Sequence, residues 1–89
     1  MKVTVLYFAS LREQVGKASE EVELPAGVAT VGALRKHLIG RGGAWQASMA
    51  EARNVRTAVN QDMVPPRAAG AAAIKAGDEI AFFPPVTGG

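Results

Sequence analysis

The sequence predicts a single α+β domain in which one main helix crosses a mixed sheet. Segments rich in β-branched and aromatic residues, or with alternating polar and apolar residues, occur near both ends and in the middle of the chain. Between them lies one stretch with the apolar spacing of an amphipathic helix. The 89 residues, 48% of them hydrophobic, are enough for one core and too few for two.

The first predicted strand covers Lys2 to Phe8, KVTVLYF. Both of its faces carry apolar side chains, which favours a central place in the sheet. Ser10 is a candidate cap for a short helical turn from Leu11 to Val15, and Gly16 suits the left-handed residue that ends such a turn. A second strand follows at residues 21–24, where polar and apolar residues alternate, and it ends before a Pro-Ala-Gly stretch.

The main helix is predicted to begin after Thr30, whose side chain suits an N-cap. Val31, Leu34 and Leu38 then lie on one face, and the glycines of residues 40–43 end the helix.

A shorter helix is predicted over residues 44–52. Its residues Trp45 and Met49 are four positions apart, so they form one small apolar patch that we expect over the rim of the core.

The remaining strands are predicted in the second half of the chain. Residues 55–59 form one strand, and Asn60-Gln61-Asp62 has the composition of a tight turn into a short strand that ends before Pro65. The alanine-rich residues 67–73 are a loop or a single helical turn. A turn at residues 75–78 leads into the last strand, residues 79–83, EIAFF.

Composition excludes several classes of function. The chain has no cysteine, which rules out disulfides and thiolate chemistry. A net charge of +2 with scattered basic residues does not predict nucleic-acid binding. No signal peptide and no apolar run of membrane-spanning length is present, so we expect a cytoplasmic protein that does not bind membranes.

The domain itself shows no pattern typical of an active site. His37, the single histidine, lies at the edge of the apolar helix face and has no obvious catalytic partner. Turn positions already explain Asp62, Asp78 and Glu79, so no metal site is predicted. The glycines of residues 40–43 lack the lysine of a phosphate-binding loop.

The end of the sequence, FFPPVTGG, differs from an ordinary domain end. We therefore divide the chain into a domain, residues 1–83, and an extended tail, residues 84–89. Pro84 and Pro85 lack N–H donors and favour an extended conformation, in which six residues span roughly 19 Å. Val86 and Thr87 offer an apolar anchor and a hydroxyl. Gly88 and Gly89 have no side chain, so a narrow channel in a partner protein can close around them.

The two phenylalanines before the tail point to opposite faces of the last strand. Either the strand is central and both Phe82 and Phe83 are covered within the domain, or one ring is exposed beside the tail for a partner. The two alternatives are compatible if a partner protein covers the ring that the domain itself leaves exposed. We therefore assign Phe82 and Phe83 to a predicted partner interface.

Four segments together are similar to a known family: KVTVLYFASLRE, TVGALRKHL, AVNQ and DEIAFFPPVTGG. They resemble the small subunit of molybdopterin synthase (MoaD), a family of ubiquitin-like β-grasp sulfur carriers. The resemblance covers nearly the whole chain and implies a β-grasp fold with a short extra helix. It also implies that the protein is a carrier and that the catalytic residues belong to a large subunit.

The resemblance further implies a role for the tail, with no cofactor bound to the domain itself. An activating enzyme of the MoeB type uses ATP to adenylate Gly89, which is then converted to a thiocarboxylate. Residues 84–89 enter the large subunit (MoaE), where sulfur passes to cyclic pyranopterin monophosphate to form molybdopterin. The assembly implied is a heterotetramer of two small and two large subunits.

Two alternative functions remain open from the sequence. One is a related carrier role, in thiamine thiazole synthesis or as a ubiquitin-like protein modifier. The other is a binding module that regulates a partner through Phe82 or Phe83 without acyl chemistry.

Overall fold

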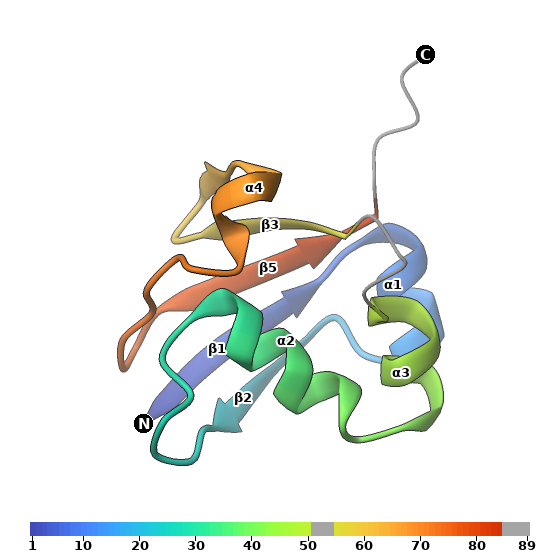
Figure 1. Ribbon diagram of the computed structural model, residues 1–89. Helices are drawn as coiled ribbons and strands as arrows, with labels where there is room; N and C mark the ends of the chain where they lie inside the picture. Colours follow the sequence, from blue (N-terminus) through green and yellow to red (C-terminus); the bar gives the residue numbers. More distant parts are fainter. Residues whose placement is uncertain (51–54, 85–89) are drawn as a thin grey trace.

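The structure is a computed structural model that describes residues 1–50 and 55–84 (Figure 1). Its elements, in chain order, are β1 (Lys2–Tyr7), α1 (Ala9–Val15), β2 (Ser19–Glu23), α2 (Val31–Ile39), α3 (Gly43–Met49), β3 (Arg56–Val59), β4 (Asp62–Val64), α4 (Pro66–Ala69) and β5 (Glu79–Phe83). No helix among these residues has the length and apolar character needed to cross a membrane.

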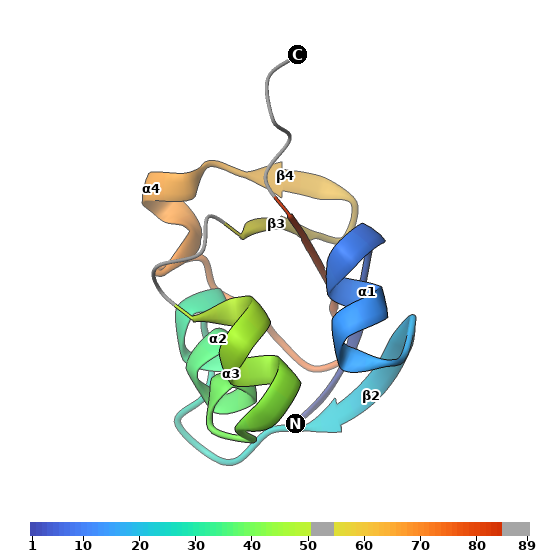
Figure 2. The same ribbon diagram turned by 90° about the vertical axis from the view of Figure 1, so that its right-hand side faces the viewer.

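The five strands form one sheet in the order β2-β1-β5-β3-β4. β1 and β5, which come from opposite ends of the chain, pair in parallel, and the other neighbours are antiparallel. Helix α2 crosses the sheet in front of β1 in Figure 1, and Figure 2 shows α2 and α3 together on one side of it. The predicted α+β class, with a mixed sheet, one main helix and a short extra helix, is confirmed.

The core lies between the helices and one face of the sheet. Its strand members are cross-strand partners, Val3 with Val22, Val5 with Ile80 and Tyr7 with Phe82, so their side chains share a face. The helical members are Leu11, Val15, Val31, Leu34, Leu38 and Met49. The opposite sheet face contributes none of its residues to this cluster, and we call it the open face.

The start of α2 agrees with the prediction. The side chain of Thr30 accepts a hydrogen bond from the backbone N–H of Ala33 at 3.1 Å, which is the expected N-cap geometry. Val31, Leu34 and Leu38 are all buried on the face toward the sheet.

The predicted cap at Ser10 is wrong. Helix α1 begins at Ala9, so Ser10 lies inside the helix, and the residue at the N-cap is Phe8, whose side chain makes no capping hydrogen bond. The shift has a physical cause, because Phe8 stays extended and its N–H donates to the carbonyl of Phe82 at 3.1 Å. The chain can therefore turn only after Phe8, at Ala9, which has a φ of 53°. The predicted left-handed exit at Gly16 is confirmed, with a φ of 81°.

Helix α3 is shorter than predicted. It ends at Met49, because the backbone of Ala50 is extended, with φ −53° and ψ 152°. The prediction placed the end at residue 52, and residues 51–54 lie outside the described part of the chain. Met49 is fully buried and Trp45 packs beside it at the edge of the core, as the spacing predicted.

The turn between β3 and β4 has two central residues, Asn60 and Gln61, with φ values of 50° and 73°. Two positive φ values are typical of the tight hairpin turn whose twist suits antiparallel strands. Asn60 is one of the few non-glycine residues that accept this conformation readily. The predicted turn is confirmed, and Asp62 already belongs to β4.

Candidate functional site

The predicted tail begins at the end of the central strand β5. β5 lies between β1 and β3, and its last residue, Phe83, is followed by half-buried Pro84. Pro84 has no N–H to donate, so the strand ends there as predicted. Of the six predicted tail residues, Pro84 is the one that the structure describes; Pro85, Val86, Thr87, Gly88 and Gly89 lie outside it.

The two phenylalanines of β5 differ sharply in burial. Phe82 is 0% exposed and packs in the core, whereas Phe83 is half-buried on the open face. Phe82 therefore has no surface to offer in the free domain, and its predicted place in a partner interface needs correction, because its ring fills the core beside Tyr7. Phe83 is the ring of this pair that keeps exposed surface, and a partner contact there stays a prediction.

Phe83 forms an aromatic pair with Phe8. The two ring centroids are 6.4 Å apart and the ring planes lie at 84°, an edge-to-face contact. Phe8 is 46% exposed. Ala9 turns the chain immediately afterwards with its positive φ, a conformation that costs an alanine about 1 kcal/mol. The turn leaves the Phe8 ring standing beside the end of β5.

A row of apolar side chains continues from this pair across the open face. Leu6 is the register partner of Ala81, Ala81 of Ala58, and Ala58 of Met63, so four strands contribute to the row. Met63 is 56% exposed. We call the surface formed by this row and the aromatic pair the open-face patch: Leu6, Phe8, Met63, Ala81 and Phe83, with the buried Ala58 at its base.

The charged residues of the open face lie away from the centre of this patch. Glu21 and Glu79 lie on either side of Thr4 in the next row across the strands, toward the start of β5. Arg56 is the partner of Phe83 at the other end of β5. The apolar part of the open face therefore extends from the middle of β5 to the end from which the tail begins, where Arg56 is its charged neighbour. Such a patch is typical of a protein interface.

Sequence reasoning found Phe83 but missed Phe8 and Met63. Phe8 is separated from the tail by most of the chain, and nothing in the sequence gives the parallel register of β1 and β5. The available signal was the alternation of KVTVLYF, which places Phe8 on the face opposite Tyr7.

A partly buried polar network joins α3 to the sheet. The hydroxyl of Tyr7 donates to Glu20 at 2.7 Å and accepts from the Nε1 of Trp45 at 3.0 Å. Arg41 donates to both carboxylate oxygens of Glu20, at 2.8 and 3.1 Å, and its guanidinium lies 5.0 Å from the centre of the Trp45 ring. Sequence reasoning did not find this network.

The network changes the acidity of its members. Burial, and then the hydrogen bond to Glu20, raise the pKa of Tyr7 above its ordinary value. Burial acts to raise the pKa of Glu20, but the hydrogen bonds from Arg41 and Tyr7 outweigh burial and lower that pKa overall. Tyr7 stays protonated and Glu20 stays ionised at neutral pH, so both groups have a structural role.

Asp78 has a structural role as well. Its carboxylate accepts from the side chain of Asn60 at 3.1 Å and from the backbone N–H of Lys75 at 2.9 Å, and these two contacts lower its pKa. Asn60 in turn accepts from the N–H of Glu79. Within residues 1–50 and 55–84, no three His, Cys, Asp or Glu side chains gather at a point that could hold a metal ion.

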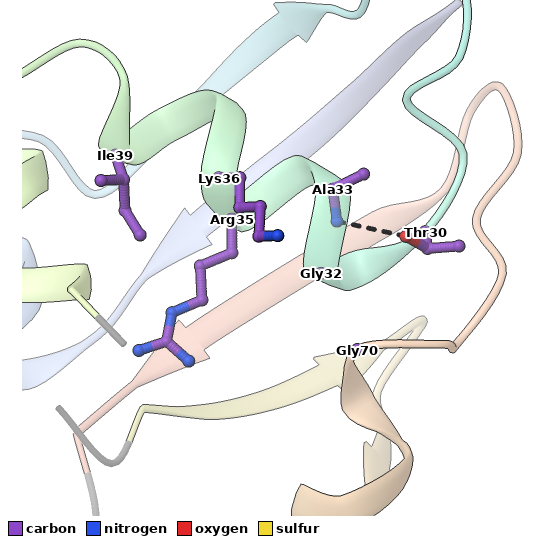
Figure 3. Close-up of a pocket in the computed structure, with 7 residues that line it drawn as sticks. All are labelled: Thr30, Gly32, Ala33, Arg35, Lys36, Ile39 and Gly70. Atoms are coloured by element: carbon purple, nitrogen blue, oxygen red, sulfur yellow. Dashed lines mark hydrogen bonds between the residues drawn. The ribbon is translucent and has the colours of Figure 1, made fainter. Parts of the chain in front are cut away.

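An open hollow of about 440 Å³ lies beside α2, lined by Thr30, Gly32, Ala33, Arg35, Lys36, Ile39 and Gly70 (Figure 3). The first backbone N–H groups of α2 are not available there, because those of Val31 and Gly32 donate to the carbonyls of Ala72 and Gly70. Arg35 donates to the carbonyls of Met49 and Ala50, both at 2.7 Å. Its guanidinium holds the backbone carbonyls at the end of α3, so Arg35 has a structural role in the wall of the hollow.

Comparison with known proteins shows similarity over the full domain. The model of the ThiS family matches residues 5–89. A molybdopterin synthase sulfur carrier subunit from Haemophilus influenzae is 41% identical over 98% of this chain and 99% of its own length. A putative molybdopterin converting factor subunit 1 from Pyrococcus furiosus has a TM-score of 0.75 at 34% identity, covering 97% of this chain and 99% of that one. SAMP1 from Haloferax volcanii has a TM-score of 0.72 at 29% identity, with both chains covered completely. The β-grasp fold expected from the resemblance is confirmed.

Proposed function

The chain belongs to the ThiS family, and on this premise we propose that it is the sulfur carrier subunit of molybdopterin synthase. Gly89 is the residue that is chemically modified to carry the sulfur. Its carboxylate is adenylated, converted to a thiocarboxylate, and delivered by residues 84–89 to the large subunit. There the sulfur passes to cyclic pyranopterin monophosphate, the precursor of molybdopterin.

The observation that carries this proposal is the position of the open-face patch. The exposed Phe8 and the half-buried Phe83 form an aromatic pair at the end of β5, the strand that leads into the tail. A partner that covers this pair is therefore placed to receive the residues that follow Phe83. The name of the Haemophilus influenzae relative, a sulfur carrier subunit, supports a partner subunit as the occupant.

The chemistry requires an activating enzyme. A carboxylate is a poor electrophile, because an oxide oxygen leaves badly. Attack of the Gly89 carboxylate on the α-phosphate of ATP releases pyrophosphate and gives an acyl adenylate. A sulfur nucleophile then displaces AMP, so that sulfur replaces one oxygen at the carbonyl carbon. An enzyme of the MoeB type would supply the ATP site and the adenylation.

The described part of the domain supports a carrier role over a catalytic one. Its ionisable groups with shifted pKa values, the buried Tyr7 and Asp78 and the partly buried Glu20, are committed to hydrogen bonds that hold the fold. Sulfur transfer to a pterin needs a positioned site that excludes water. We assign that site to the large subunit, in an assembly of two small and two large subunits, and we place the reaction in the cytoplasm, where ATP is available.

A second candidate function follows from the likeness to SAMP1, which is a small archaeal modifier protein. A modifier uses the same activated terminus but joins it to a lysine amine of another protein. The two functions differ in the product. After sulfur transfer a carrier again has a free carboxylate at Gly89, whereas a modifier is recovered joined to other proteins by isopeptide bonds.

A reconstituted assay with the activating enzyme, ATP, a sulfur source and the large subunit tests the proposal. Deleting Gly89, or adding one residue after it, should abolish molybdopterin formation, because the reactive carbonyl is lost or displaced. The matched control adds one residue before Met1, which should keep the activity. Full activity of the protein extended after Gly89, without trimming, would contradict a role for that carboxylate.

A further inference from the structure

The three methionines of the chain differ widely in exposure. Met63 is 56% exposed, Met1 is 37% exposed, and Met49 is fully buried in the core. Because the chain has no cysteine, methionine is the side chain on which it can undergo reversible sulfur oxidation. Accessibility therefore ranks Met63 first among the three.

The surroundings of Met63 keep its thioether accessible. Met63 lies in β4, the outermost strand on its side of the sheet, and its register partner is Ala58, followed across the sheet by Ala81. Two alanines have no side chains long enough to cover a neighbouring methionine. The thioether thus stands at the border of the open-face patch.

We propose that Met63 is an oxidation site whose conversion to methionine sulfoxide switches off docking at the open-face patch. The oxidant is a peroxide: its O–O bond breaks, one oxygen bonds to the sulfur, and the other leaves as water. The sulfur gives up two electrons and the peroxide is reduced. A methionine sulfoxide reductase reverses the step: two thiols supply two electrons and become a disulfide, and the oxygen leaves as water. The inference rests on the proposed function, because it assumes that a partner covers the patch.

The sulfoxide weakens docking because it adds a polar oxygen to the apolar side chains of the open-face patch. The side chains next to Met63 across the sheet, Ala58 and then Ala81, have no hydrogen-bond donor for that oxygen. In the free protein water satisfies the oxygen, so folding is little affected. A docked partner removes the water, and the acceptor is left without a donor. Oxidation of Met49 would instead disrupt the core.

The first test follows the oxidation itself. The full chain is treated with hydrogen peroxide, and peptide mass spectrometry gives the rate of sulfoxide formation at each methionine. We expect Met63 to be oxidised first, Met1 next and Met49 last. Oxidation of Met49 or Met1 ahead of Met63 would overturn the proposal, and this readout does not depend on the function of the protein.

The second test measures affinity for the large subunit by titration calorimetry, with each variant compared with its own unoxidised form. Peroxide should weaken wild-type binding about tenfold or more, the effect of one buried acceptor without a partner, and the reductase should restore it. The variant Met63→Leu, which keeps the apolar volume but cannot be oxidised, should show no change on treatment.

The outcomes separate the two proposals. Equal wild-type affinity before and after oxidation at Met63 would overturn the switch while leaving the proposed function intact. Failure of the untreated wild-type protein to bind the large subunit would overturn both. A loss of affinity in Met63→Leu as large as in wild type would assign the effect to another residue and overturn the role of Met63.

Discussion

The ring of Phe8 meets the ring of Phe83 edge to face, with the centroids 6.4 Å apart. Phe8 follows β1 and Phe83 ends β5, and the parallel pairing of these strands brings the two ends of the domain together. The contact places an exposed aromatic surface where the tail begins. One register therefore fixes both the position of the patch and its place beside the end of β5.

Replacing each phenylalanine of β5 by alanine should give opposite results. Phe82→Ala removes a fully buried ring and should destabilise the fold by about 3–5 kcal/mol. Phe83→Ala should cost the fold about 1 kcal/mol, because it loses a half-buried ring and its contact with Phe8, but it should weaken binding to the large subunit about tenfold or more. Urea unfolding and titration calorimetry measure the two effects. Unchanged affinity in Phe83→Ala would remove the patch from the interface.

The contact between Gly32 and Gly70 predicts a second pair of variants. A Cβ on Gly32 would lie 2.7 Å from the carbonyl oxygen of Gly70, which belongs to backbone and cannot move aside easily. Gly32→Ala should therefore cost about 1–3 kcal/mol. The matched control, Gly70→Ala, places its Cβ in open space at a φ of −61° and should be neutral or stabilising by up to about 1 kcal/mol. Urea unfolding gives the free energy of unfolding of both variants. Equal stability of the two would contradict the close packing of α2 against the backbone at Gly70.

The Tyr7 hydroxyl should matter for stability. Tyr7→Phe removes a donor to Glu20 and the acceptor of the Trp45 indole, so we expect a loss of about 1–3 kcal/mol in the free energy of unfolding. Trp45 is the single tryptophan, and its fluorescence should report the change directly. The control is Ser48→Ala, which removes a hydrogen bond within α3 to the carbonyl of Ala44 and should cost less than Tyr7→Phe. A larger loss in the control would show that the network does not anchor α3.

Stability should fall in acid through Glu20. Its pKa in the folded protein lies below the value in the unfolded chain. The contribution of Glu20 is therefore present in full above the ordinary glutamate pKa, about 4.3, and is lost as the pH falls through the lower folded pKa. Glu20→Gln should be less stable than wild type near neutral pH and should lose less stability on acidification. Asp78, whose pKa is also lowered, retains its own acid sensitivity in that variant. Parallel pH profiles for the two proteins would contradict the role of Glu20.

Local patterns predicted most of the elements. The Thr30 cap, the buried face of α2, the turn at Asn60 and the strand at residues 79–83 all follow from short-range chemistry that the sequence displays. The prediction of Ser10 as an N-cap was wrong, because a long-range hydrogen bond from the N–H of Phe8 to the carbonyl of Phe82 keeps Phe8 extended. Helix α1 therefore begins two residues earlier than predicted. A local capping rule has no information on such a contact.

The site was harder to predict than the fold. Alternation along β5 placed Phe82 and Phe83 on opposite faces but could not tell which face the helices cover. That choice depends on the packing of α2 and α3 against β1, which also places Phe8 in the patch. The network of Tyr7, Glu20 and Trp45 joins three separate segments, and only their tertiary arrangement reveals it.

The most direct test of the account is the intact mass of the protein after incubation with the activating enzyme, ATP and a sulfur source. We predict a single species in which one oxygen is replaced by one sulfur, and fragmentation should place the change at Gly89. Subsequent incubation with the large subunit and cyclic pyranopterin monophosphate should return the original mass. An unmodified Gly89 under conditions in which a known carrier is fully converted would contradict the account.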